Sequence, residues 1–204
     1  MSGSKGKFIV LEGGDGSGKS TQAALLAETL RASGRTVVET REPGGTGLGR
    51  AIRALVLEGG AVDPVAEMLL MAADRAQHVA EVIAPAIASG SWVVCDRFLP
   101  SSLVYQGIVR HLGVDAVEHV NSAACAGVQP DLVIVLDVDD AVAERRRSTL
   151  DDRFEREGDS FHAQVRAAYR KLARARGWQI VDANGERDEI AARVAALVED
   201  EPGR

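Results

Sequence analysis

The sequence has only two cysteines in 204 residues, which limits the metal and redox chemistry available to the protein. Cys95 lies in an apolar run typical of a strand, and Cys125 lies among small residues in a stretch typical of a helix. No CxxC pair is present, and no Cys/His spacing suits a zinc site. We therefore expect both thiols to be reduced and buried as small hydrophobic side chains.

Long apolar runs and an excess of positive charge are missing as well. No run approaches the ~18 residues of a membrane span, and residues 1–7 lack the apolar core of a secretory signal, so we expect a cytoplasmic protein. The net charge of −6 argues against broad binding to nucleic acid or to anionic membranes. With 46% hydrophobic residues and no repeat or linker, residues 1–204 are expected to form one globular domain.

Short apolar runs alternate with longer helical patterns, which is typical of βαβ units. The pattern predicts an α/β fold in which a five-stranded parallel sheet is flanked by helices on both faces and most strands are buried on both faces. The expected strands are 8–12, 36–40, 92–95, 132–137 and 178–182. The expected helices are 19–33, 46–58, 64–89, 100–109, 114–127, 140–147, 159–176 and 186–199. We expect the long helix over 64–89 to bend near Pro85.

A GxxxxGK[ST] pattern lies between the first expected strand and the first expected helix. Its residues, together with the one that follows, are Gly13, Gly14, Asp15, Gly16, Ser17, Gly18, Lys19, Ser20 and Thr21. Backbone N–H groups of such a loop and the positive end of the next helix bind phosphate oxygens. Lys19 is then placed to contact the β- and γ-phosphates of ATP, and Ser20 to ligate Mg²⁺. The alternative interpretation is a glycine-rich turn with a solvated lysine. It would require the strand, the loop residues and the helix to occur together by chance.

Other polar residues follow the second and third expected strands, where ligands bind in open parallel sheets. Asp96 suits a carboxylate that orients Mg²⁺, and Arg97 suits a contact with a second phosphate; a structural Asp–Arg pair is the alternative. Residues 41–46, Arg-Glu-Pro-Gly-Gly-Thr, form a turn that a ligand can approach closely. The Glu42–Pro43 bond is a candidate for the cis isomer, although an ordinary loop fits the sequence equally well.

Two helical segments could add to such a site. Met71 lies one turn before Arg75 in the long expected helix, so one helix face could present both an apolar surface and a cation for a phosphate. The alternative is that Asp74 and Arg75 form a surface ion pair. The arginine-rich run 144–157 is either a solvated helical face or a lid over a transferred phosphoryl group. As a lid, it would supply Arg153 as the catalytic arginine and Arg146 and Arg147 to the phosphate donor.

Taken together, these segments resemble bacterial thymidylate kinases, which belong to the P-loop nucleoside monophosphate kinases. The resemblance rests on FIVLEG at 8–13, the phosphate loop, REPGGT at 41–46, AADR at 72–75, DRF at 96–98, SSLVYQG at 101–107 and PDLVIVLDV at 130–138. It implies a P-loop NTPase fold, phosphorylation of dTMP to dTDP with ATP and Mg²⁺, and a homodimer.

The resemblance also implies roles for individual residues. Asp15 would bond the 3′-hydroxyl of the acceptor sugar and steady Arg97, while Arg97 and Arg75 would hold the acceptor phosphate and the thymine edge. Tyr105 would pack beneath the deoxyribose, and Ser102 would face the base. The other residues expected at the acceptor site are Glu42, Pro43, Arg53, Met71 and Gln106. Lys19, Arg153 and a Mg²⁺ ion near Ser20 and Asp96 would stabilise charge on the transferred group.

Four positions depart from the family pattern. Met71 stands where an aromatic residue usually stacks on thymine, and Ser148 and Thr149 stand where familiar enteric-type members have a lid arginine. Gly16 replaces the loop arginine of some members, so that charge must come from elsewhere. Other nucleoside monophosphate kinases remain alternatives, as does a deoxynucleoside kinase with Glu42 as base. A nucleotide-operated switch is the rival from another class, but no Asn-Lys-x-Asp motif is present.

Overall fold

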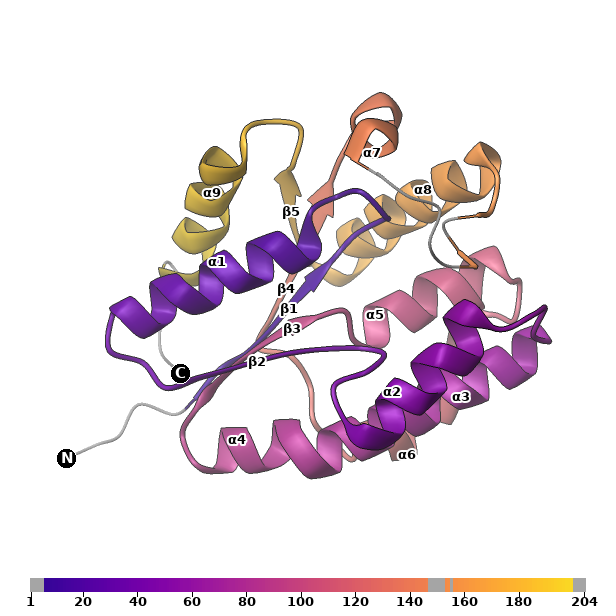
Figure 1. Ribbon diagram of the computed structural model, residues 1–204, viewed down its shortest axis with the longest axis horizontal. Helices are drawn as coiled ribbons and strands as arrows, with labels where there is room; N and C mark the ends of the chain where they lie inside the picture. The colour runs from indigo at the N-terminus through magenta and orange to yellow at the C-terminus, as the bar shows by residue number, and fades with distance from the viewer. Residues whose placement is uncertain (1–5, 147–152, 155, 200–204) are drawn as a thin grey trace.

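The computed structural model describes residues 6–146, 153–154 and 156–199, and it is built on a five-stranded parallel sheet (Figure 1). The strand order is β2-β3-β1-β4-β5. The strands are β1 (Phe8–Glu12), β2 (Val37–Arg41), β3 (Trp92–Asp96), β4 (Leu132–Asp137) and β5 (Gln179–Asp182). The predicted fold class is confirmed, with strand bounds that differ from the prediction by one residue at most.

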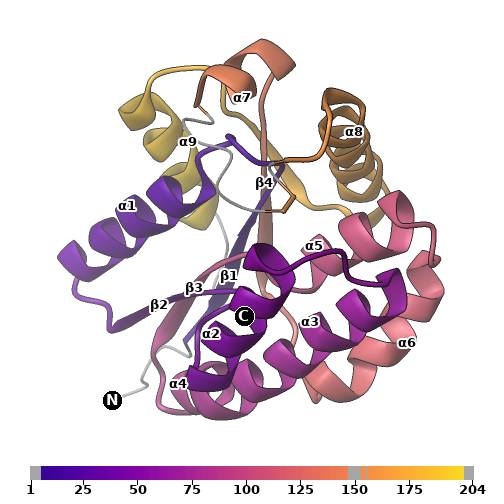
Figure 2. The same cartoon turned by 45° about the vertical axis from the view of Figure 1, so that its right-hand side comes forward.

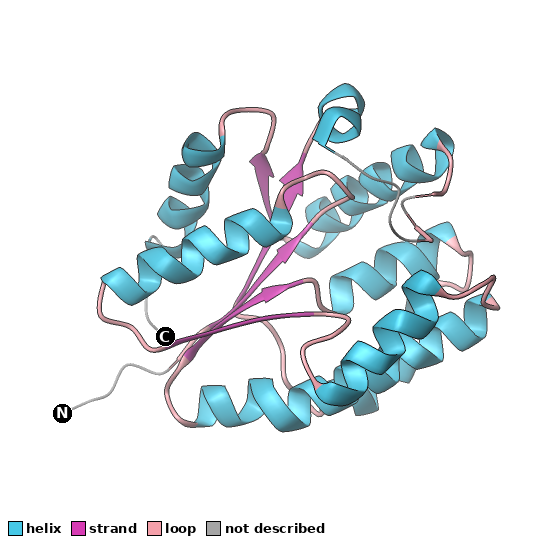
Figure 3. Cartoon of the chain, in the orientation of Figure 1, coloured by secondary structure: helices cyan, strands magenta, loops and turns pink. Residues whose placement is uncertain are grey.

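Helices connect the strands on both sides of the sheet (Figure 3). They are α1 (Lys19–Ala32), α2 (Gly47–Arg53), α3 (Pro64–His78), α4 (Ala84–Ala88), α5 (Leu99–Ser102), α6 (Val114–Cys125), α7 (Asp140–Arg146), α8 (Asp159–Arg176) and α9 (Arg187–Glu199). The predicted helix over 64–89 is interrupted by a π-helical turn at Val79–Ile83, and those over 46–58 and 100–109 end in π-helical segments at Ala54–Glu58 and Leu103–Val109. The turn at Val79–Ile83 ends two residues before Pro85, which has no N–H group for a regular helical bond. No helix in the described residues is both long and apolar enough to span a membrane.

The two faces of the sheet bury different clusters because side chains alternate along each strand. On β1, Ile9 and Leu11 pack with α1 and α9, whereas Phe8 and Val10 face the opposite layer. That second layer holds α3, α4, α6 and α8, which lie across the sheet from α1 and α9 in the turned view (Figure 2). Cys95 is buried in the second layer, and both cysteines are free, as expected.

The outer strands differ from the three central ones. Every residue of β1 and β3 is buried, whereas β2 and β5 are largely part-exposed or exposed. Most strands are therefore buried as expected, and the exceptions are the two outer strands, each of which has only one neighbour. Glu12, Arg41 and Asp96 end the three adjacent strands β1, β2 and β3, at the same end of the sheet.

Candidate active site

A cleft with a volume of about 280 Å³ lies beyond this edge of the sheet. It unites segments that are far apart in sequence and contains most of the predicted site residues. Those lining it are Asp15, Gly16, Gly18, Lys19, Ser20, Thr21, Glu42, Pro43, Arg53, Met71, Asp96, Arg97, Tyr105 and Gln106. Four further lining residues were not predicted: Arg41, Leu57, Ser101 and Phe154. Gly13, Gly14, Ser17, Arg75, Ser102, Arg146 and Arg153 are not among the lining residues.

The phosphate loop leaves the start of α1 open. The residue before the helix, Gly18, has a φ of 88°, and no side chain caps the first turn. The first N–H groups of α1 therefore remain for a ligand, at the end of the helix that attracts anions. The Lys19 ammonium donates to the carbonyl of Gly14 at 2.8 Å. Burial, reinforced by the charge of Arg97, lowers the pKa of Lys19 to about 8.

Gly16 has a φ of 79°, and it lies directly against α7. A Cβ atom at this position would be 2.4 Å from the carbonyl oxygen of Ala143. The loop therefore accepts no side chain at position 16 in this arrangement. A cation for the transferred phosphoryl group has to come from another segment.

Ser20 and Asp96 meet beside the loop, where a divalent cation was expected. The Ser20 hydroxyl donates to Oδ2 of Asp96 at 2.5 Å, while Oδ1 of Asp96 is buried with no hydrogen-bond partner among the described residues. Hard oxygen ligands of this kind suit Mg²⁺, which usually keeps several waters and substrate phosphates in its shell. No group of three or more His, Cys, Asp or Glu side chains in the described residues could hold a metal ion alone. The site thus fits a cation that arrives with nucleotide phosphates.

Arg97 lies between the phosphate loop and the second half of the cleft. Its φ is 71°, a conformation that few residues other than glycine adopt. The guanidinium donates to Asp15 at 2.6 Å and to the carbonyl of Gly13 at 3.1 Å, and it stacks over the ring of Tyr105 at 5.3 Å. The predicted pairing of Asp15 with Arg97 is therefore present in the structure.

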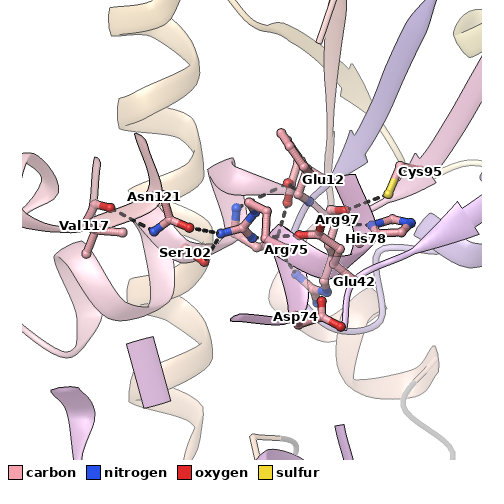
Figure 4. Close-up of polar contacts among 12 residues, drawn as sticks. Glu12, Glu42, Asp74, Arg75, His78, Cys95, Arg97, Ser102, Val117 and Asn121 are labelled. Atoms are coloured by element: carbon pink, nitrogen blue, oxygen red, sulfur yellow. Dashed lines mark hydrogen bonds and ion pairs between the residues drawn. The ribbon is translucent and has the colours of Figure 1, made fainter. Parts of the chain in front are cut away.

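Arg75 does not line the cleft in this structure. It is fully buried, and its guanidinium lies among polar side chains from several segments (Figure 4). Its guanidinium pairs with Glu42 at 2.8 Å, donates to Ser102 at 3.2 Å and donates to the side-chain oxygen of Asn121. The other Glu42 oxygen contacts the His78 ring at 2.9 Å. The surface-pair interpretation of Arg75 is wrong, and Glu42 is engaged on both oxygens.

The loop at 41–46 is anchored rather than open. The Glu42–Pro43 bond is cis, as the sequence suggested, and the Gly44 N–H donates to Asp74 at 3.2 Å. A Cβ atom at Gly45 would be only 2.6 Å from the His78 ring. The loop backbone at Gly45 therefore packs directly against the His78 side chain of α3. Burial, together with the nearby charge of Glu42, raises the pKa of Asp74 to about 6. The loop is held as one wall of the cleft.

Comparison with known proteins identifies the family. The family model for thymidylate kinase matches residues 11–194. The chain is 49% identical over 193 residues to a thymidylate kinase from Synechococcus sp. (strain JA-3-3Ab), with 94% of each chain covered. It is 51% identical over 194 residues to one from Leifsonia xyli subsp. xyli (strain CTCB07), covering 93% of this chain and 92% of the relative. The chain belongs to the thymidylate kinase family.

Within this thymidylate kinase fold, the two described arginines that were assigned roles in the lid, Arg146 and Arg153, lie in different places. Arg146 donates to the carbonyls of Ala183 and Gly185 at 2.7 and 2.9 Å, beside a second cleft on the outer side of the phosphate loop. Arg153 pairs instead with the buried Glu67 and donates to the carbonyl of Val56 at 2.9 Å. The structure does not bring Arg153 to the loop. Arg147, Ser148 and Thr149 lie outside the described residues.

Several residues that organise the thymidylate kinase site were missed by the sequence prediction. The Glu67 carboxylate accepts a hydrogen bond from the Gln106 amide at 2.7 Å, and the side-chain oxygen of Asn121 accepts one from the Arg75 guanidinium. Glu12 accepts hydrogen bonds from Ser101 and Tyr169. A charged residue at the end of a buried strand was a usable signal for Glu12. Nothing in the local sequence marks the other residues.

Proposed function

We propose that this protein transfers the γ-phosphoryl group of ATP to dTMP, forming dTDP and ADP. The observation that carries the proposal is that one cleft holds both a phosphate loop and a second cation, Arg97, which is held by an ion pair with Asp15. A nucleotide hydrolase needs one phosphate site, whereas phosphoryl transfer between nucleotides needs two. The membership in the thymidylate kinase family supports the same reaction and the same acceptor.

The donor half would bind ATP through the phosphate loop. The free N–H groups at the start of α1 and the ammonium of Lys19 are suited to the phosphate oxygens. Ser20 and Asp96 would hold Mg²⁺, which neutralises charge on the phosphates when it is bound. Arg146 lies beside the outer cleft at this loop, which favours a contact with the remainder of the donor nucleotide.

The acceptor half would bind dTMP between the loop at 41–46 and the segment 99–109. Arg97 and Arg53 supply positive charge for the acceptor phosphate, and Asp15 accepts a bond from the sugar hydroxyl. Tyr105 provides a ring beneath the sugar, and Met71 provides a polarisable apolar surface for the base.

The base edge has a suitable polar partner. Gln106 lines the cleft, and its side-chain oxygen is buried with no hydrogen-bond partner among the described residues. A buried acceptor without a partner favours a ligand that brings an N–H group, such as the imide of thymine. Arg75 and Ser102 stand behind this wall and fix it through their mutual bond.

The chemistry requires positioning and charge stabilisation but no strong base. An acceptor phosphate is already ionised at neutral pH, so no proton has to be removed before transfer. Both Glu42 oxygens are engaged with Arg75 and His78, which disfavours Glu42 as the base of a deoxynucleoside kinase. Arg153 could act on the phosphoryl group only after leaving Glu67; in the described arrangement we assign it to holding the acceptor wall.

A homodimer forms part of the proposal. Most of the large hydrophobic side chains that are exposed in the described residues lie between positions 48 and 69. They are Leu48, Leu55, Val65 and Leu69. Such a cluster favours burial against a second copy of the chain. Sedimentation velocity tests this: we expect twice the monomer mass, and a monomer at micromolar concentration would contradict it.

A coupled assay of ADP release tests the proposed reaction. ATP and Mg²⁺ are offered with dTMP, dUMP, dCMP, dGMP, AMP or thymidine in separate reactions. We expect rapid turnover with dTMP and slow turnover with the other five. Preference for another monophosphate would retain the kinase and change its substrate, and ATP hydrolysis that is indifferent to every acceptor would support the switch interpretation.

A further inference from the structure

Glu12 ends β1 directly before the phosphate loop, and its side chain is completely buried. It points to the sheet face that carries Phe98, beneath the loop rather than into the cleft. A carboxylate in such a place is costly unless hydrogen bonds compensate for the loss of water. Burial raises the pKa of Glu12, and the positive charge of Arg97 opposes that rise.

Four donors converge on this carboxylate. Oε1 accepts from the backbone N–H groups of Phe98 at 2.9 Å and Ser101 at 3.2 Å. Oε2 accepts from the hydroxyl of Ser101 at 2.7 Å and from that of Tyr169 at 2.8 Å. Burial also raises the pKa of Tyr169 well above its usual value, so its hydroxyl stays a donor at neutral pH.

The same two hydroxyls contact Arg97. Nη1 of Arg97 lies 3.2 Å from the Ser101 oxygen and 3.2 Å from the Tyr169 oxygen. Each hydroxyl group has one proton, and the two hydroxyl oxygens also lie 2.9 Å from each other. The carboxylate of Glu12 is a stronger acceptor than either hydroxyl, so both protons are directed at it. The lone pairs of both oxygens are therefore available to the guanidinium, which donates to them.

We propose that Glu12 is a positioning residue for Arg97: by taking the protons of Ser101 and Tyr169, it turns both hydroxyl oxygens into acceptors that hold the guanidinium in place. The inference rests on the proposed role of Arg97 at the acceptor phosphate. Glu12 itself touches neither nucleotide. It acts through three side chains that come from β3, α5 and α8 or their immediate continuations.

Glu12→Gln tests this without changing the volume of the side chain. The amide oxygen must face the two backbone N–H groups, so the NH₂ group faces the hydroxyls and donates to them. Their protons are then displaced toward Arg97. We expect kcat/KM for dTMP to fall about 30-fold, while KM for ATP changes less than about twofold. The matched control is Asp131→Asn at the opposite end of β1, where the amide oxygen still accepts the Phe8 N–H.

A double-mutant cycle separates positioning from general stability. In an Arg97→Ala background, Glu12→Gln should change kcat/KM for dTMP less than about twofold, because the group it positions is gone. An equal 30-fold loss in both backgrounds would overturn the proposal. If Glu12→Gln fails to fold, Tyr169→Phe replaces it in the same cycle, with an expected loss of about fivefold that again disappears without Arg97.

The wild-type assay distinguishes this proposal from the proposed function. If the protein phosphorylates another monophosphate, the assignment of dTMP fails, and the same cycle run with that acceptor still decides the role of Glu12. Calorimetric titration with dTMP in the absence of ATP adds a readout that does not depend on turnover. We expect weaker dTMP binding for Glu12→Gln than for Asp131→Asn, and equal affinities would contradict the positioning role.

Discussion

The two halves of the cleft differ in how their polar groups are satisfied. In the donor half, α1 begins without a side-chain cap, and one oxygen of Asp96 has no hydrogen-bond partner among the described residues. In the acceptor half, Arg75 and Glu67 are buried and already paired with side chains from other segments. The donor half therefore obtains its missing partners from the ligand, whereas in the acceptor half Arg75 and Glu67 are paired by the protein before any ligand binds, and the Gln106 oxygen is left for the base.

The largest effect is expected where the ligand is the missing partner. Lys19→Ala removes the buried ammonium beside the phosphates, and we expect kcat to fall about 10³-fold with an unchanged melting temperature. Steady-state kinetics and thermal unfolding measure the two quantities. Lys171→Ala, an exposed lysine on α8, is the control and should retain normal turnover. Turnover within tenfold of wild type would break the assignment of the donor half.

The acceptor half should instead lose stability when one of its internal partners is removed. Glu67→Gln leaves the Arg153 guanidinium without its buried carboxylate, so we expect the free energy of unfolding to fall by about 3 kcal/mol. KM for dTMP should rise about tenfold because Gln106 loses its anchor, with KM for ATP unchanged.

Glu157→Gln is the matched control for Glu67→Gln. This carboxylate pairs with Arg110 at 2.7 Å, but both side chains are partly exposed to solvent. We expect a loss of less than about 1 kcal/mol in urea unfolding. Equal losses for the two variants would mean that burial does not distinguish the acceptor network from a surface ion pair.

Asp74 allows the acceptor half to be tested by pH. Its pKa is raised in the folded protein, so its contribution to stability is complete below about pH 4 and is lost as the pH rises through about 6. Asp74→Asn cannot ionise, and its oxygen can still accept the Gly44 N–H. We therefore expect the variant to gain about 2 kcal/mol over wild type between pH 4 and pH 8, measured by urea unfolding. A difference that is constant with pH would show that Asp74 ionises normally.

The smallest expected effect concerns the base platform. Met71→Phe presents a flat ring in place of a flexible thioether, and we expect KM for dTMP to fall about threefold. Parallel measurements with dUMP show whether selectivity changes with affinity. A raised KM for both acceptors would indicate that the wall held by Arg75 and Glu67 leaves no room for a ring.

Most of the donor half could be predicted from sequence because the residues of its phosphate loop are consecutive. Strand, glycine loop and helix follow one another, so the pattern that identifies the loop also predicts its geometry. The order of elements likewise predicted the parallel sheet, although nothing local showed that β2 and β5 would be its edges.

The acceptor half could be predicted as a set of residues but not as an arrangement. Arg75 was identified from its motif, yet its burial depends on Asn121, which lies 46 positions away. Glu12 and Tyr169 are 157 positions apart and meet only because α8 packs across the face of the sheet. Such distant partners decide the direction in which a long charged side chain points. The neighbouring sequence does not identify these partners.

The close approach of Gly16 to Ala143 has a consequence for protein engineering. The loop and helix α7 are in direct contact at Gly16, with no room for a side chain between them. A loop taken from a relative that has an arginine at this position would therefore clash with the backbone of α7. The two segments are therefore a single exchangeable unit. A chimaera that replaces residues 13–20 together with 140–146 should fold. One that replaces the loop alone should displace α7.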